Sequence, residues 1–173
     1  MGLFTNSIHP AAGEGLSQEG GIIAVKHLTN GSNLSSTNNI PRDNSAPTIS
    51  EGIELFTVSH SLAVSTNKLI FFLSLYGNED SNQGDTIAAA LFAGSTCIYV
   101  GMLNASLNVQ NYDTCHHTFM YSRGSTDATT YSLRCGVEGG TYEHINNMTY
   151  ASNSEYNQLR HSSFALMEAS STW

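Results

Sequence analysis

Ser65 and Lys68 are the two residues whose types and spacing come closest to a catalytic motif. The segment reads STNK and matches S-x-x-K, in which a lysine activates a serine nucleophile. That chemistry needs the serine at the start of a helix, with the lysine one turn further on. Because the segment is predicted as a turn that enters a strand, we expect no nucleophilic catalysis from it.

Other enzyme signatures are absent from the sequence. The glycine-rich stretch of residues 15–21 has no Lys followed by Ser or Thr, so it cannot bind phosphate as a P-loop does. No H-E-x-x-H, C-x-x-C or G-x-S-x-G pattern occurs. We therefore expect neither an enzyme nor a cofactor.

Histidines are the next candidates, as metal ligands. Cys115, His116 and His117 are adjacent, but neighbours on a strand point to opposite faces and cannot chelate one ion within a chain. One His from each of three chains around a threefold axis could bind a metal, although hydrogen-bonded or interface histidines are the favoured interpretation. The same interpretation applies to His27, His60 and His144. We expect no metal site.

Carboxylates offer two further kinds of site. Residues 78–85 (NEDSNQGD) have oxygen ligands suited to Ca²⁺ but lack a Gly and a bidentate Glu at the positions that an EF-hand requires, so a solvated acidic turn is the better interpretation. Glycan cleavage needs two carboxylates that meet in space, and spacing alone leaves this open for Glu51, Glu54, Glu138 and Glu143. A binding role is favoured over cleavage.

The elements that position these residues are short strands. Apolar or aromatic residues alternate with polar ones most clearly in residues 117–121 and 131–137, the pattern of half-buried strands. Residues 68–76 (KLIFFLSLY) are mostly apolar and are predicted to be buried on both faces. Residues 85–94 could form a short alanine-rich helix but are predicted as a strand. The remaining strands are expected at 22–28, 53–61, 96–100 and 163–169.

Eight short strands without a convincing helix predict an all-β fold, an antiparallel two-sheet jelly-roll β-sandwich. We divide the chain into an extended N-terminal arm, residues 1–21, and one jelly-roll domain, residues 22–173. The arm is expected to be an attachment segment, with contacts made by Leu3, Phe4, Ile8, His9 and Pro10.

Composition excludes several partners. Charged residues are only 12% of the chain and the net charge is −8, which argues against nucleic-acid binding. No apolar run approaches the roughly 20 residues of a membrane-spanning helix, and the first residues do not resemble a secretory signal.

The three cysteines are expected to be reduced, with one disulfide as the alternative.

Five stretches, in order, resemble the C1q/TNF-like jelly-roll domains of bacteriophage tail-fibre tips and other phage surface proteins. They are residues 40–55, 65–77, 89–95, 121–136 and 159–169. The resemblance implies a homotrimer that binds through its surface. Few charges, together with the aromatic residues Tyr76, Tyr99, Tyr121 and Tyr131, also favour a trimer that buries one side of each sandwich.

Two functions follow from this resemblance. The leading hypothesis is a non-enzymatic structural protein of a phage particle, assembled in the host cytoplasm and acting as capsid decoration or cement, with other virion proteins as partners. The alternative is a tail-fibre or tail-attached tip that binds a host glycan or protein. Its binding residues would be four loop tyrosines, Tyr112, Tyr142, Tyr150 and Tyr156. A cellular C1q-like module is a remote third possibility.

Overall fold

The computed structural model describes residues 21–32, 34–79, 86–104, 113–138, 143–145 and 161–171, which form ten strands and no helix. None of these residues lies in a helix that could span a membrane. The strands are β1 (Ile22–Asn30), β2 (Leu34–Ser36), β3 (Ile53–His60), β4 (Lys68–Glu79), β5 (Thr86–Ala93), β6 (Thr96–Asn104), β7 (Asp113–Tyr121), β8 (Thr129–Val137), β9 (Glu143–Ile145) and β10 (Ser162–Ala169).

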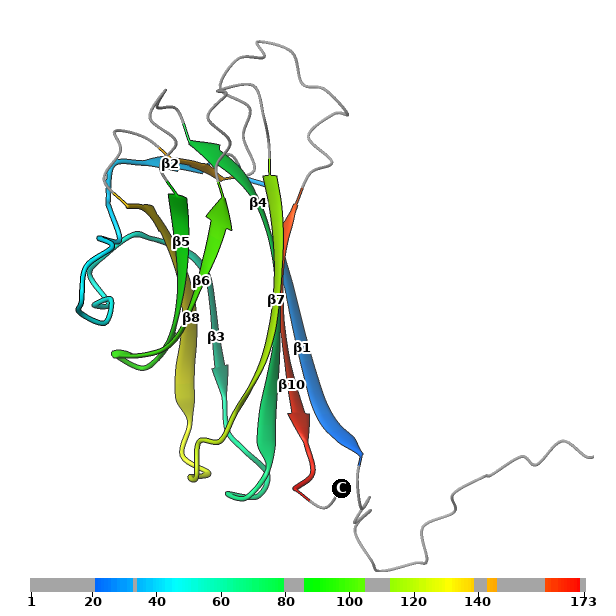
Figure 1. Cartoon of the computed structure of the whole chain (residues 1–173). Helices are drawn as coiled ribbons and strands as arrows, with labels where there is room; N and C mark the ends of the chain where they lie inside the picture. The colour runs from blue at the N-terminus through cyan, green and yellow to red at the C-terminus, as the bar shows by residue number, and fades with distance from the viewer. Residues whose placement is uncertain are drawn as a thin grey trace, which may run out of the picture.

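Two antiparallel sheets face each other (Figure 1). The long strands of sheet A lie in the order β1-β10-β4-β7, and the short β9 and β2 extend this sheet at one end of β4. Sheet B has the order β3-β8-β5-β6. When the eight long strands are numbered along the chain, the two orders become 1-8-3-6 and 2-7-4-5. This is the double Greek-key arrangement of a jelly roll, so the predicted fold is confirmed.

The core lies between the sheets and is built by alternation along each strand. The ring of Phe71 is at its centre, with ring centroids 5.0 Å from Phe119, 5.4 Å from Tyr131 and 5.9 Å from Phe164. These four rings come from both sheets and from residues up to 93 positions apart. Burying such large apolar side chains supplies most of the driving force for closing the sandwich.

The sequence located the strands well but placed some ends wrongly. Strand β6 continues to Asn104, and β7 begins at Asp113, four residues before the predicted start. Residues 86–93 form a strand rather than a helix because β5 pairs with both β6 and β8. The short β2 and β9 lie outside the segments that were predicted to be strands. None of the three cysteines forms a disulfide, as expected.

Strand β4 is not buried on both faces, contrary to prediction. Leu69, Phe71, Leu73 and Leu75 are at most 2% exposed, whereas Phe72 on the other face is 40% exposed. The strand whose two faces are both covered is β5, in which Leu91 and Phe92 are each fully buried. The difference arises because one sheet has a covering segment within the chain and the other, in the described residues, does not.

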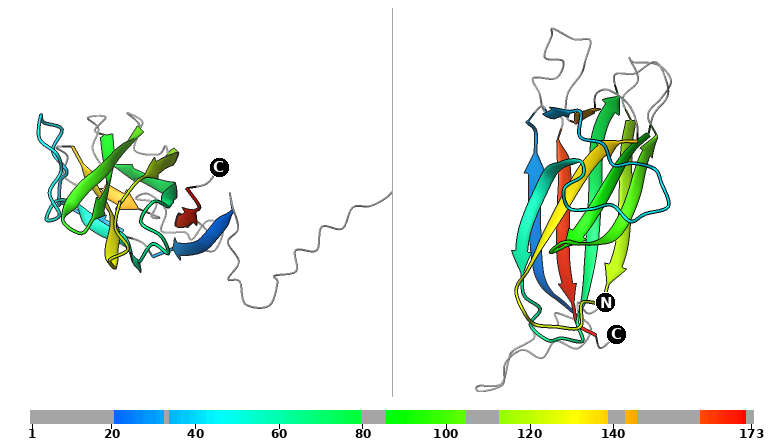
Figure 2. Two further views of the ribbon diagram at one scale, coloured as in Figure 1. Left: turned by 90° about the horizontal axis from the view of Figure 1, so that it is seen from below. Right: turned by 90° about the vertical axis from the view of Figure 1, so that its left-hand side faces the viewer.

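That covering segment is the strap, defined here as residues 37–52. It lies in front of sheet B in Figure 2 (right panel, cyan). Ile40 packs against Ala90 and Phe92 on the outer side of β5, and its N–H donates a 3.0 Å hydrogen bond to the carbonyl of Val137. The strap therefore covers part of the outer face of sheet B.

The two ends of the sandwich differ. Ile22 lies opposite Ala169 and Ala169 lies opposite Lys68, so both ends of the described chain lie at one end, called here the arm end. The N–H of Ser170 donates to the carbonyl of Gly21 across 3.0 Å. The other end, called the loop end, is where the chain enters and leaves residues 80–85, 105–112, 139–142 and 146–160 (Figure 1).

Candidate assembly surface

The outer face of sheet A carries a row of apolar side chains that crosses all four long strands. Val25 of β1 pairs with Met167 of β10, which pairs with Ile70 of β4, which in turn pairs with Met120 of β7. Because these residues are at matching positions of the register, their side chains project from the same face. The next row, towards the loop end, contains His27, Ala165, Phe72 and Thr118.

We define the assembly face by the apolar residues of this surface. They are Ile23, Val25, Ile70, Phe72, Met120 and Met167. Four of them are strongly exposed, with Ile23 at 45%, Val25 at 54%, Phe72 at 40% and Met120 at 68% of their maximal area. Single exposed apolar residues are ordinary, whereas exposed apolar residues that lie together across a whole sheet are typical of surfaces that contact a partner.

Few charges interrupt the assembly face. In the described residues its only lysine is Lys68, at the margin, whose amine donates a 2.8 Å hydrogen bond to the Ser122 hydroxyl. Lys26 of β1 lies on the opposite side of the strand and reaches the carbonyl of Ser59 across 2.5 Å. Charged residues are depleted at the centres of protein interfaces because their desolvation is costly. The composition of the face therefore suits contact with another protein surface.

The predicted metal candidates do not converge. His116 is exposed on the outer side of β7, while His117 points inward, and its Nδ1 atom lies 2.9 Å from the Tyr99 hydroxyl. The two rings point to opposite faces, as predicted. His60 is buried beside Glu168, and His27 is on the outer side of β1. No group of three potential metal-ligating side chains occurs in the described parts of the chain.

Three of the four glutamates considered for catalysis are engaged in separate contacts. Glu138 lies 3.5 Å from Arg42, and Glu54 lies 3.9 Å from Arg134. Glu51 accepts a 3.0 Å hydrogen bond from the N–H of Thr48. Glu143 belongs to β9. The S-x-x-K segment is a turn followed by the first residue of β4, as predicted.

The predicted binding and attachment residues fall outside the described residues. These are Tyr112, Tyr142, Tyr150, Tyr156 and the arm residues Leu3, Phe4, Ile8, His9 and Pro10. The described ends of the chain nevertheless show where each group leaves the sandwich. The four tyrosines belong to segments that begin and end at the loop end, and the arm enters at Gly21 at the arm end.

Three of the four tyrosines that were expected to favour a trimer pack within the sandwich instead. Tyr131 is 1% exposed in the core, Tyr121 packs against the core, and the Tyr99 ring stacks on Phe119 at 4.2 Å. Only Tyr76 projects from the outer side of β4. The surface that remains uncovered is made by aliphatic residues and Phe72. The even-numbered positions of β4 were the available signal, but they were interpreted as a second buried face.

Comparison with known proteins assigns no family. No protein-family model and no curated protein matches the chain. Among solved structures, it is similar to dimeric latent PorU from Porphyromonas gingivalis, at 14% identity and a TM-score of 0.44, over 84% of this chain and 12% of that chain. It is also similar to the structure of the infectious bursal disease virus Gx strain, at 15% identity and a TM-score of 0.43. The match covers 84% of this chain and 36% of that chain.

A third similar structure is the VP2 subviral particle of infectious bursal disease virus, at 13% identity and a TM-score of 0.41, over 84% of this chain and 37% of that chain. This chain therefore spans about an eighth of the PorU chain and little more than a third of the two viral chains. At 13–15% identity, these similarities assign no activity or partner to it.

Proposed function

We propose that this chain is a non-enzymatic structural protein of a virus particle, a bacteriophage surface protein that forms a homotrimer through the assembly face and acts as capsid decoration or cement. The observation that carries the proposal is the row Val25–Met167–Ile70–Met120 on a sheet face that no described segment covers. The proposal of a phage particle and of a trimer rests on the five stretches that resemble phage C1q/TNF-like domains. The jelly-roll strand order agrees with that resemblance.

The size of the face supports an interface of ordinary extent. Four strands about 4.8 Å apart and nine residues long cover roughly 600 Å², and a standard interface buries about 800 Å² on each partner. In a closed trimer each subunit contacts its two neighbours through two different patches. The assembly face would supply most of one of these patches, and burying it contributes about 25 cal/mol per Å² of apolar area before the costs of association.

Sedimentation equilibrium of the purified full chain tests the trimer, with Met120→Asp as the decisive variant. Met120 is 68% exposed, so the fold should tolerate this change, whereas an unpaired carboxylate within an interface is strongly unfavourable. We expect a trimer for the wild type and a monomer for Met120→Asp, with unchanged circular dichroism. The matched control is Thr57→Asp, at an exposed position of β3 on sheet B, which should remain trimeric.

Two results would refute the assembly proposal. One is a wild-type mass equal to that of a single chain at micromolar concentration. The other is a trimer that persists unchanged in Met120→Asp, because the interface must then lie elsewhere. If Met120→Asp is a monomer, its circular dichroism spectrum shows whether the chain is still folded.

Attachment to a particle is supported by the separation of the two ends. The arm enters at Gly21, whereas the tyrosine-containing segments begin and end at the opposite end. Removing residues 1–20 keeps the Gly21 carbonyl that Ser170 uses. Under the cement proposal, the truncated chain should form trimers but fail to bind particles. Unchanged particle binding would exclude an attachment role for the arm.

The alternative function, a receptor-binding tip, is favoured by the grouping of Tyr112, Tyr142, Tyr150 and Tyr156 in segments that meet the sandwich at the loop end. Tyrosines are well suited to binding surfaces because each combines an apolar ring with a hydroxyl. Copy number separates the two functions. Quantitative gel densitometry of purified particles should give hundreds of copies for a cement protein and at most a few tens for a tip.

A further inference from the structure

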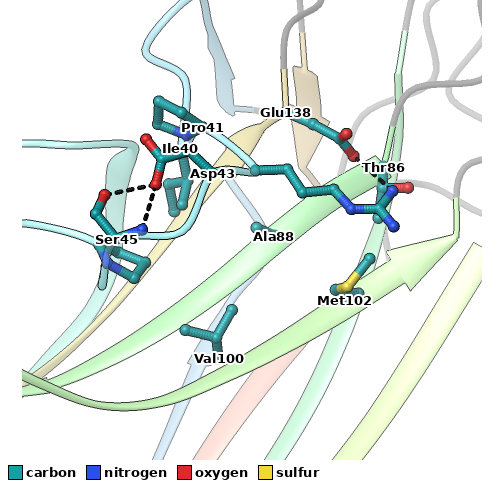
Figure 3. A pocket seen from close by; sticks show the side chains of 11 residues that line it. Ile40, Pro41, Asp43, Ser45, Thr86, Ala88, Val100, Met102 and Glu138 are labelled. Atoms are coloured by element: carbon teal, nitrogen blue, oxygen red, sulfur yellow. Dashed lines mark hydrogen bonds and ion pairs between the residues drawn. The ribbon is translucent and has the colours of Figure 1, made fainter.

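A hollow lies on the outer face of sheet B (Figure 3). The assembly face belongs to sheet A and is on the opposite side of the sandwich. Its volume is about 150 Å³. The floor is apolar and consists of outward-facing residues of β5 and β6, Ala88, Val100 and Met102. Val100 and Met102 are 43% and 44% exposed. The hollow is therefore an accessible depression with an apolar base.

One wall of the hollow is the strap, which hydrogen bonds hold in place. The Ile40 N–H donates to the Val137 carbonyl at 3.0 Å, and the Gly52 N–H donates to the Asn39 carbonyl at 3.2 Å. Arg134 of β8 donates from Nε to the Glu51 carbonyl at 2.7 Å and from Nη2 to the Gly52 carbonyl at 2.8 Å. A wall fixed in this way is already formed before a ligand arrives, which lowers the entropy cost of binding.

Polar groups surround the apolar floor. Arg42 and Glu138 both line the hollow, with Nη1 of Arg42 3.5 Å from Oε2 of Glu138. On the strap, one Asp43 oxygen accepts hydrogen bonds from the Ser45 N–H at 2.7 Å and the Ser45 hydroxyl at 2.5 Å. These bonds lower the pKa of Asp43, the side-chain bond most. Thr86 completes the polar rim.

The rim retains both donors and acceptors for a ligand. A guanidinium has five N–H groups and a carboxylate about four acceptor positions, and the side chain of Arg42 is 67% exposed. The rim carries one positive charge, on Arg42, and two negative charges, on Asp43 and Glu138. Its net charge therefore disfavours an anionic ligand, and its acceptors favour a ligand rich in hydroxyl groups.

The volume of the hollow limits the class of ligand further. Ligand pockets for larger molecules have volumes of about 300–1,000 Å³, whereas a cavity of about 150 Å³ accommodates a single six-membered ring. A ring that presents C–H groups on one face and hydroxyl groups around its edge matches an apolar floor with a polar rim. We propose that this hollow binds one uncharged pyranose ring of a glycan. This site is independent of the trimer and of the cement function, so either proposal can fail alone.

The test uses full-length protein labelled with ¹³C at the methionine methyl groups, titrated by NMR. Met102 is in the hollow and Met120 is on the opposite sheet, so the second serves as an internal reference. The probes are the methyl glycosides of glucose, galactose, mannose and N-acetylglucosamine, together with glucuronate and benzyl alcohol. We expect at least one methyl glycoside to shift the Met102 signal in a saturable manner and to leave Met120 unchanged.

Two variants connect the shift to the hollow. Ala88→Leu should fill the floor and abolish the Met102 response, while Thr57→Leu, at an exposed position on the other edge strand of the same sheet, should retain it. Arg42→Ala should weaken binding about tenfold, because it removes charge-assisted hydrogen bonds. Retention of the Met102 shift in Ala88→Leu would overturn the assignment of the site.

Each remaining outcome also decides the proposal. If no glycoside shifts Met102, or if Met102 and Met120 shift alike, the hollow is not a sugar site. Binding of benzyl alcohol without any glycoside would identify a site for an aromatic side chain instead. Tighter binding of glucuronate than of the methyl glucoside would overturn the uncharged ligand class.

Discussion

The Nε2 atom of His60 lies 2.8 Å from Oε2 of Glu168, and both side chains are buried, with 7% and 1% of their area exposed. His60 ends β3 in sheet B, and Glu168 is in β10 of sheet A, so this contact joins the two sheets at the arm end. The second carboxylate oxygen accepts hydrogen bonds from the Ala63 N–H at 2.7 Å and the Asn67 side-chain amide at 2.6 Å. Glu168 thereby holds the connection between β3 and β4 as well.

Removing this carboxylate should cost much of the stability of the domain. Glu168→Ala leaves the buried donors of Asn67 and His60, and the partly buried N–H of Ala63, without their acceptor. We expect a loss of about 3–5 kcal/mol in the free energy of unfolding. Guanidinium chloride denaturation measures this loss. The control is Glu138→Ala, which removes the partly exposed ion pair with Arg42. This variant should lose less than about 1 kcal/mol of unfolding free energy. Equal losses for the two variants would show that the buried contacts of Glu168 add little.

Phe71 and Phe72 are neighbours in sequence with opposite environments, one fully buried and one 40% exposed. Phe71→Ala should lower the unfolding free energy of the subunit by about 3–5 kcal/mol, since it leaves a cavity among three rings. Phe72→Ala should cost the isolated subunit less than about 1 kcal/mol but should weaken self-association. Denaturation of a monomeric Met120→Asp background separates the two effects. A large loss from Phe72→Ala in that background would contradict an uncovered face.

Gly136 allows the strap to approach β8. A Cβ atom at this position would lie 2.7 Å from the Ile40 nitrogen and 2.8 Å from the Asn38 carbonyl oxygen. Gly136→Ala should therefore displace the strap and destabilise the protein by about 1–3 kcal/mol. It should also shift the Met102 methyl signal, because the wall of the hollow moves. Gly94→Ala is the comparison, since a Cβ atom there would have no other atom within 4 Å and the cost comes only from a φ of +62°. An unchanged Met102 signal in Gly136→Ala would contradict a displaced strap.

Cys97 should react slowly with alkylating reagents at neutral pH. Burial raises the pKa of this thiol and is the largest effect. The hydrogen bond to the Tyr99 carbonyl opposes it, and the Glu51 carboxylate, the smallest of the three effects, raises the pKa again. A higher pKa means less thiolate at a given pH, and the thiolate is the reactive species. The rate of iodoacetamide labelling at Cys97, followed by mass spectrometry, should rise at higher pH than for a free cysteine in solution. A labelling rate that rises at the same pH as that of free cysteine, or at a lower pH, would contradict the burial.

Local patterns in the sequence were sufficient to identify most of the strands. Tyr131, Leu133, Cys135 and Val137 alternate with more polar residues, and this period of two applies whichever strands lie alongside. The inward face of β8 was predictable for that reason. The short β2 and β9 were missed because three residues are too few to show a period, and they form only through pairing with each other and with the end of β4.

The candidate surfaces could not be located in the same way. Ile70 and Phe72 have the composition of buried residues, and the sequence does not show whether another segment covers them. The row Val25–Met167–Ile70–Met120 joins residues up to 142 positions apart, and the hollow joins the strap to β5, β6 and Glu138. Such groupings depend on strand order and register, which long-range contacts decide.

The sequence by itself determined the all-β character, the strand positions, the sparse charge and the side of most strands that faces inward. These follow from residue type and from the period of two, which are local properties of the chain. Only the tertiary structure decided that the strap covers sheet B while sheet A stays uncovered in the described chain. It also decided that Arg42, Ala88 and Met102 border one hollow, because covering and enclosure are relations between distant segments that pack together.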